Sequence, residues 1–109
     1  MKQRIIAVDL DGTLAEYDGW QGEEHVGEPI APMVARVREW LSEGHDVRIF
    51  TARAFTASAV PPIEAWCLRH LGKVLRVTNV KEHDVNEIWD DRAIQVERNT
   101  GRVLGVEPV

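Results

Sequence analysis

Short apolar runs that alternate with segments of helical periodicity are the feature that most constrains the fold of this chain. Ile5–Val8, Val47–Phe50 and Val74–Val77 are mostly apolar, and polar or small residues follow each of them. Strands that are buried on both faces of a parallel sheet have this composition, because helices cover the sheet and few side chains face water. The alternation predicts an α/β fold with a mainly parallel central sheet.

Two segments between these runs have the spacing expected of helices that bury one face. The first begins at about Pro32 and stops before Gly44. The second lies between the pair Pro61-Pro62 and Gly72. Proline near the start and glycine after the end are typical helix boundaries. The residues that recur three and four positions apart on these faces are Met33, Val34, Val37, Trp40, Leu41, Ile63, Trp66, Cys67, His70 and Leu71.

The C-terminal third of the chain predicts shorter elements. Glu87–Trp89 has the pattern of a fourth strand. Residues 94–96 and 103–104 form a terminal apolar pair on either side of Asn99-Thr100-Gly101, a sequence that favours a turn. We therefore expect a terminal hairpin.

The segment 15–31 is the one long stretch without a regular pattern, and it is rich in glycine, glutamate and aromatic residues. Because it directly follows an acidic motif, we expect it to form a flap over a site. Tyr17 and Trp20 lie in this flap. Stacking against a substrate and simple packing are both open to these two rings.

Length, charge and cysteine content limit the classes of protein that fit. A chain of 109 residues is near the usual size of one domain, so residues 1–109 are expected to form a single unit. The net charge of −5 and the scattered basic residues argue against a non-specific nucleic-acid surface. No apolar stretch predicts a membrane span or a signal peptide, and Cys67 is the only cysteine. We expect a cytoplasmic protein without membrane contact and with Cys67 in the core.

The polar residues that follow the apolar runs are the candidate site. In parallel α/β sheets, ligands bind at the carboxyl ends of the strands. The residues collected there are Asp9, Asp11, Thr51, Lys81, Asp90 and Asp91. Four carboxylates carry roughly −4, whereas Lys81 and Arg53 supply about +2, so a divalent cation is needed to balance the cluster. Oxygen ligands without a histidine or cysteine cluster favour Mg²⁺ over zinc.

Each of these residues also has an ordinary structural explanation. An Asp-Gly pair is frequent in turns, Thr51 fits the cap of a helix, and Arg53 fits a salt bridge. Among the lysines of the chain, Lys73 is the alternative candidate for the lysine of this site. The joint pattern, and not any single residue, favours a site.

The acidic motif and the spacing of the polar positions resemble the haloacid-dehalogenase-like (HAD) hydrolases over nearly the whole chain. Asp9-Leu10-Asp11-Gly12-Thr13 is similar to the first motif of that family, Thr51 to the second, Lys81 to the third and Asp90-Asp91 to the fourth. The resemblance implies a Rossmann-like three-layer sandwich. No inserted domain fits on either side of Thr51, so the chain is similar to the small capless members without a cap domain.

The same resemblance implies a Mg²⁺-dependent phosphatase that acts on phosphomonoesters through an aspartyl-phosphate. Asp9 would be the nucleophile, and Asp11 would be the general acid and base. Thr51 and Lys81 would be catalytic: Thr51 would bind phosphoryl oxygens, and Lys81 would offset charge on the nucleophile and in the transition state. Apart from the resemblance, Arg53 is a further candidate for binding the substrate, together with Thr51 and Lys81.

The metal ligands implied by the resemblance are Asp9, Asp11 through its backbone carbonyl, and one or both of Asp90 and Asp91. Asp90 is the first choice between the last two. The substrate stays open between a phosphorylated small molecule, such as a nucleotide or sugar phosphate, and a macromolecular phosphate end. A capless site is open to solvent, and a second copy of the chain is one way to close it.

The alternative function is a non-hydrolytic module, either a receiver-like phosphoacceptor or an inactive HAD-type binding domain. Motif order argues against a receiver, whose phosphorylated aspartate follows the third strand. Here the later apolar runs lead to Thr51 and to Thr78-Asn79, and neither offers an acceptor carboxylate.

Overall fold

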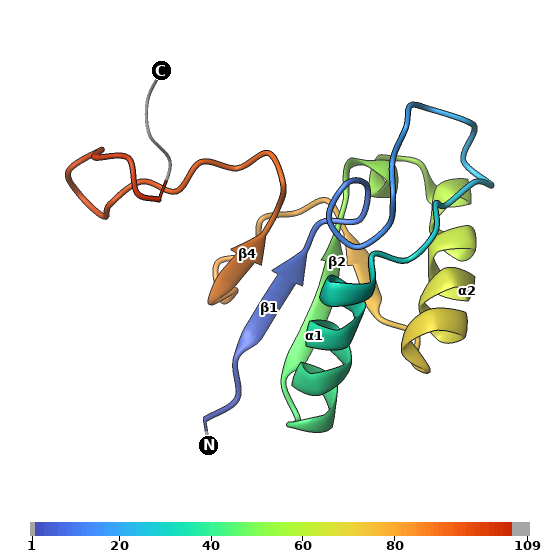
Figure 1. The fold of residues 1–109 in the computed structure, drawn as a ribbon, viewed down its shortest axis with the longest axis horizontal. Coiled ribbons are helices and arrows are strands. Elements are labelled where there is room, and N and C mark those ends of the chain that lie inside the picture. Colours follow the sequence, from blue (N-terminus) through green and yellow to red (C-terminus); the bar gives the residue numbers. More distant parts are fainter. Residues whose placement is uncertain (1, 106–109) are drawn as a thin grey trace.

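The computed structural model describes residues 2–105, in which strands and helices alternate (Figure 1). The elements are β1 (Ile5–Val8), α1 (Ala31–Ser42), β2 (Asp46–Phe50), the 3-10 turns η1 (Ala52–Phe55) and η2 (Ala57–Ala59), α2 (Val60–Leu71), β3 (Arg76–Thr78) and β4 (Glu87–Trp89). The predicted first and fourth strands are confirmed, as is the presence of both helices. The third strand starts two residues later than predicted, because its pairing with β2 begins at Arg76. The predicted domain ends at residues 1 and 109 lie outside the described part.

All four strands are parallel and follow the order β3-β2-β1-β4. Val8, near the end of β1, pairs with Ile49 of β2 on one side and with Trp89 of β4 on the other. The predicted α/β class with a parallel sheet is confirmed. Because the strands are parallel, the residues that follow β1, β2 and β4 meet at one edge.

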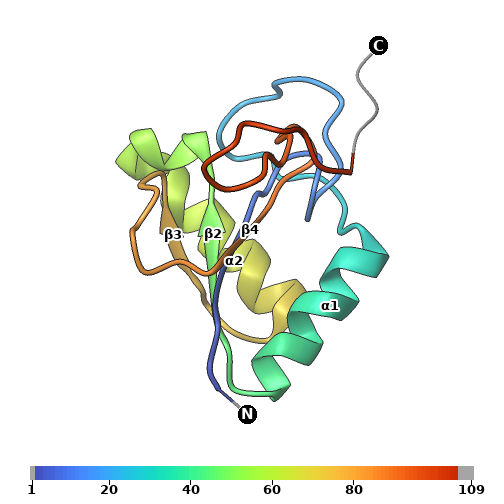
Figure 2. The same cartoon turned by 90° about the vertical axis from the view of Figure 1, so that its left-hand side faces the viewer.

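The hydrophobic core lies on the face of the sheet that both helices cover. Figure 2 shows α1 and α2 on the same side of the strands, and the two helices contact each other. Trp40 of α1 packs against Trp89 of β4, with ring centroids 5.0 Å apart. Cys67 is fully buried in this core, as predicted, and burial raises the pKa of its thiol to about 11. Within residues 2–105 no helix covers the opposite face, so the described part has two layers.

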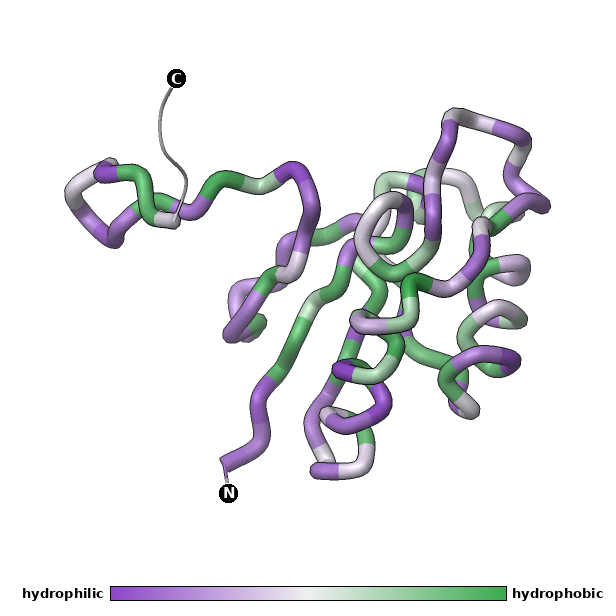
Figure 3. The backbone as a smooth tube through the Cα atoms, in the orientation of Figure 1, coloured by the Kyte–Doolittle hydropathy of each residue, from purple (hydrophilic) through white to green (hydrophobic). Residues whose placement is uncertain are grey.

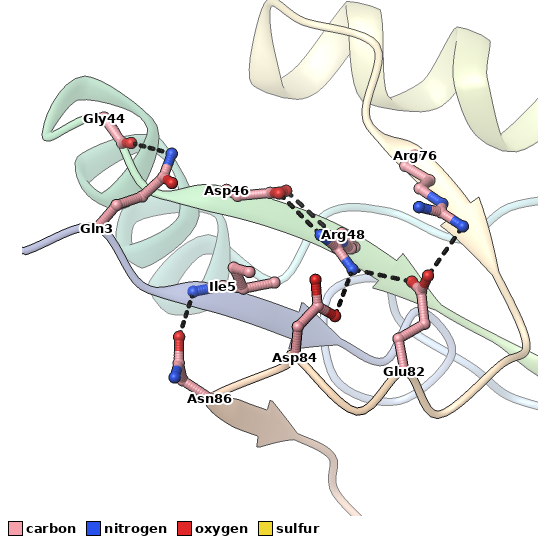
Figure 4. Close-up of polar contacts among 9 residues, drawn as sticks. All are labelled: Gln3, Ile5, Gly44, Asp46, Arg48, Arg76, Glu82, Asp84 and Asn86. Atoms are coloured by element: carbon pink, nitrogen blue, oxygen red, sulfur yellow. Dashed lines mark hydrogen bonds and ion pairs between the residues drawn. The ribbon is translucent and has the colours of Figure 1, made fainter.

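The opposite face of the sheet carries a network of charged residues around Arg48, which is only 8% exposed. Its guanidinium donates to Asp46, to Glu82 at 3.0 Å and to Asp84 at 3.3 Å (Figure 4). Arg76 of β3 forms a second ion pair with Glu82, at 2.9 Å. These contacts fix the connection between β3 and β4 against this face.

The C-terminal segment leaves the edge of the sheet after β4 (Figure 1). The predicted terminal pair is reduced to one antiparallel bridge between Val96 and Val103. An ion pair between Glu97 and Arg102 closes the turn at 2.8 Å. In the described part of the chain, no helix combines the length and the apolar character that a membrane crossing requires.

Candidate active site at the carboxyl edge of the sheet

Three carboxylates converge where β1 and β4 end. The backbone N–H of Asp9 donates to the carbonyl of Trp89 at 2.9 Å, which continues the pairing of the two strands by one residue. One oxygen atom from each of Asp9, Asp90 and Asp91 lies within 4.8 Å of the other two. Burial, and then the negative charge of Asp90 and contact with Asp91, raise the pKa of Asp9 to about 7. Burial and the neighbouring carboxylates thus disfavour the ionised form of Asp9, and a bound cation would offset that cost.

Gly12 and Thr13 bring Asp91 against the first motif. Thr13 is buried, and its hydroxyl donates to Asp91 Oδ1 at 2.8 Å and accepts from the Asp91 N–H at 2.9 Å. The first of these bonds lowers the pKa of the Asp91 carboxyl. Gly12 has φ +88°, and a Cβ there would lie 2.7 Å from Asp91 Oδ2, so glycine is required by both conformation and space. Sequence reasoning assigned Thr13 no role, although its place directly after Gly12 was a usable signal.

Asp90 belongs to the same cluster and is the less exposed member of the pair. Its Oδ1 accepts a hydrogen bond from the N–H of Arg92 at 2.8 Å, which turns the chain away from the sheet. Both Asp90 and Asp91 contribute an oxygen, so the geometry supports both as ligands.

Thr51 follows β2 and is 4% exposed. Its Oγ1 accepts from the N–H of Arg53 at 3.2 Å, so Thr51 does cap the turn η1. Within the described part, its hydroxyl hydrogen has no protein acceptor, and the residue lines the same cavity as Asp9. Capping and phosphate binding are therefore compatible, because they use different parts of the hydroxyl.

Arg53 joins the acidic motif to the flap. Its guanidinium donates to both carboxylate oxygens of Asp11, at 2.9 and 2.8 Å, and to the carbonyl of His25 at 2.7 Å. It also lies over the ring of Trp20, 4.9 Å from the centroid. The Arg53 side chain is 6% exposed, so this predicted ligand is also a structural ion-pair partner.

The flap itself is anchored at its base and along one side. Glu16 N–H donates to the carbonyl of Glu28 at 2.8 Å, and the indole of Trp66 in α2 donates to the carbonyl of Gly27 at 2.9 Å. A Cβ at Gly27 would lie 1.9 Å from the Glu16 carbonyl oxygen, so only glycine permits this approach. Figure 3 shows that the flap is mostly hydrophilic. These contacts hold the two ends of the flap together, and Tyr17, Trp20 and Glu23 from the flap line the cavity.

A cavity of about 1070 Å³ brings most of the predicted residues together. Those that line it are Asp9, Asp11, Tyr17, Trp20, Thr51, Arg53, Asp90 and Asp91. Phe55, Asn79 and Arg92 also line it and were not predicted. For Arg92 the available signal was a basic residue directly after the acidic pair.

Lys81 is the predicted residue that does not line the cavity. It is exposed in the connection between β3 and β4, and Asn79 is the residue of that connection that reaches the cavity wall. The neighbouring Glu82 is held by Arg48 and Arg76 on the sheet face opposite the helices. The alternative Lys73 precedes β3 and so lies toward the other edge of the sheet. The role of Lys81 stays a prediction.

Comparison of the chain with models of protein families, with curated proteins and with solved structures gave no match. What the site does is therefore inferred from its own residues.

Proposed function

We propose that this chain is a Mg²⁺-dependent phosphomonoester hydrolase of the capless HAD type, with Asp9 as its nucleophile. The observation that carries the proposal is the shared cavity, in which a carboxylate cluster at the ends of β1 and β4 lies beside Thr51 and Asp11. The central position of β1 in a parallel sheet supports a Rossmann-like arrangement. Nucleophile, proton carrier and hydroxyl donor are the groups that hydrolysis of a phosphate ester requires.

The donor set of the cluster fits Mg²⁺. Three carboxylate oxygens within 4.8 Å of one another suit a small, hard cation. The raised pKa of Asp9 agrees with this, because a cation would remove the electrostatic cost of ionising that carboxyl. Asp9, Asp90 and Asp91 would hold the ion with the carbonyl of Asp11. When bound, the ion would offset negative charge on the phosphoryl oxygens.

In the first step a carboxylate oxygen of Asp9 bonds to phosphorus, and the bond from phosphorus to the leaving oxygen breaks. Asp11 gives its proton to that leaving oxygen. In the second step a water oxygen bonds to phosphorus while Asp11 accepts a proton from the water. The bond between Asp9 and phosphorus breaks, and phosphate leaves. The hydroxyl of Thr51 donates to a phosphoryl oxygen in both steps.

Asp11 must leave Arg53 before it can carry a proton, since the ion pair occupies both of its oxygens. A phosphoryl group competes for the same guanidinium, because the two-pronged donor of arginine matches phosphate as well as carboxylate. Entry of the phosphate would therefore move Arg53 from Asp11 to the substrate. This exchange gives Arg53 the binding role and frees Asp11 for catalysis.

The test is phosphate release by the purified chain with Mg²⁺ across a panel of nucleotides, sugar phosphates and phosphorylated oligonucleotides. Asp9→Asn should reduce release at least about a thousandfold, because it removes the nucleophile. Asp18→Asn is the matched control, since Asp18 is an exposed flap residue outside the cluster. Release by Asp9→Asn at the wild-type rate, or no release on the whole panel, would contradict the proposal.

A module that binds phosphate without turnover is the second candidate. The observation that favours it is the engagement of both Asp11 oxygens by Arg53, which leaves no free proton carrier. A phosphoacceptor of this kind would accumulate stable phosphate on Asp9 when treated with acetyl phosphate. A hydrolase would instead clear the phosphate within the assay, so mass spectrometry of the treated protein separates the two.

A further inference from the structure

The exposed aromatic rings of the described residues all gather at the cavity. The aromatic residues that pack into the core are Trp40, Trp66 and Trp89. Phe50, at the end of β2, lines the cavity wall. The other three, Tyr17, Trp20 and Phe55, are 47%, 61% and 87% exposed, and each of them lines the cavity. Exposed rings gathered at one place indicate a binding surface, because they keep a large apolar area in water without stabilising the core.

Two of these rings, those of Phe55 and Trp20, adjoin the residues that are proposed to bind phosphate. Phe55 closes the turn η1, four residues after Thr51. Trp20 comes from the flap, and the guanidinium of Arg53 lies over its ring, 4.9 Å from the ring centroid. If a phosphate bound near Thr51 and Arg53, the part of the substrate that is esterified to it would thus lie beside aromatic surface.

We propose that the substrate is a nucleoside monophosphate whose base stacks on Phe55 and Trp20, an inference that rests on the proposed phosphatase function for the phosphate end. Stacking of a base on an aromatic side chain strengthens binding by about tenfold or more. A sugar phosphate has no aromatic base to stack on the rings, so it would gain less binding from them. The cavity of about 1070 Å³ has room for the whole nucleotide.

The charge of the flap selects a free nucleotide over the end of a nucleic-acid strand. Residues 15–31 contain five acidic side chains and no lysine or arginine. The acidic residues are Glu16, Asp18, Glu23, Glu24 and Glu28. A strand carries further phosphates beyond its terminal one. Proteins that bind single strands contact these phosphates along a positively charged groove. The flap supplies no lysine or arginine for such a groove.

The test compares kcat/KM for AMP and for ribose 5-phosphate, which share the phosphate and the ribose and differ by the base. The wild-type ratio should be at least about ten in favour of AMP, and Phe55→Ala should lower it about tenfold. Leu68→Ala is the control, because Leu68 is an exposed apolar residue of α2 outside the cavity and should leave the ratio unchanged. Equal use of both compounds, or an unchanged ratio in Phe55→Ala, would overturn the inference.

Two further measurements separate this inference from the proposed function. Asp9→Asn should bind AMP at least about tenfold more tightly than ribose 5-phosphate in calorimetry. That preference without phosphate release by the wild type would refute the hydrolase and keep the nucleotide site. Hydrolysis of both compounds without preference would keep the hydrolase and refute the nucleotide site. An oligonucleotide with a terminal phosphate should react at least tenfold more slowly than AMP, and a faster reaction would overturn the choice of a free nucleotide.

Discussion

The guanidinium of Arg53 and the carboxylate of Asp11 form a two-pronged ion pair, Nε to Oδ2 at 2.9 Å and Nη2 to Oδ1 at 2.8 Å. The same guanidinium binds the carbonyl of His25 and lies over the ring of Trp20. One side chain therefore connects the acidic motif, the turn after β2 and the flap. Any change that moves Arg53 changes both the shape of the cavity and the freedom of Asp11.

Replacing Arg53 by glutamine should lower the free energy of unfolding by about 2 kcal/mol, because a partly buried carboxylate loses its partner. The matched control is Arg102→Gln. Arg102 also forms an ion pair, with Glu97, but its side chain is 66% exposed, and its loss should cost less than about 1 kcal/mol. Urea denaturation of the two variants and the wild type measures the difference. Equal effects would show that the Arg53 pair is no stronger than a surface contact.

The contribution of Asp9 to the stability of the metal-free protein should fall with rising pH. Its pKa is about 7 when folded and 3.8 ordinarily, so folding favours the protonated form. The stabilisation is complete below about pH 4 and is lost as pH rises through about 7. Asp91, Asp84 and Glu87 have lowered pKa values and act in the opposite direction, so the wild type must be compared with Asp9→Asn.

In chelator, Asp9→Asn should gain about 2 kcal/mol over the wild type between pH 5 and pH 8, part of the roughly 4 kcal/mol that the full shift would give. Chemical denaturation at a series of pH values gives this difference directly. A difference that stays constant across this range would refute the raised pKa of Asp9.

Mg²⁺ should raise the Tm of the wild type, since an ion that binds the folded state stabilises it by about 2.7 kcal/mol at one hundred times its Kd. The rise should be larger at pH 8 than at pH 5.5, because protons compete for Asp9. Asp91→Asn should reduce the rise, and Asp18→Asn should keep it. A Tm that responds to Mg²⁺ equally in both variants would place the ion elsewhere.

Lys81→Ala should lower kcat/KM for phosphate release at least about tenfold. The reason is the role that the HAD resemblance implies for this lysine, which is to offset negative charge in the transition state. Lys73→Ala is the control, because Lys73 is also exposed but precedes β3 and should change release less than twofold. If Lys81→Ala kept phosphate release and Arg92→Ala lost it, the prediction would be wrong. Arg92, which lines the cavity, would then be the cationic residue of the site.

Much of the fold followed from local pattern. The strands 5–8 and 87–89 and the two amphipathic helices were predicted because apolar spacing along a short segment reflects which side chains it can bury. Parallel strands present their carboxyl ends at one edge of the sheet. This rule predicted that Asp9, Asp11, Thr51 and the pair Asp90-Asp91 lie close together. The start of β3 and the reduced terminal hairpin were less predictable, because pairing with a distant strand sets such limits.

The sequence by itself determined the α/β class, the parallel sheet and the acidic edge, since these depend on burial patterns that a few neighbouring residues express. Tertiary structure alone decided the contacts between distant residues. Thr13 meets Asp91 across 78 positions of the chain, and Arg53 meets Asp11 across 42. Side-chain packing and hydrogen-bond geometry select such pairs, and no local pattern encodes them. For the same reason Phe55 emerged as a cavity residue, whereas Lys81 lies outside the cavity lining.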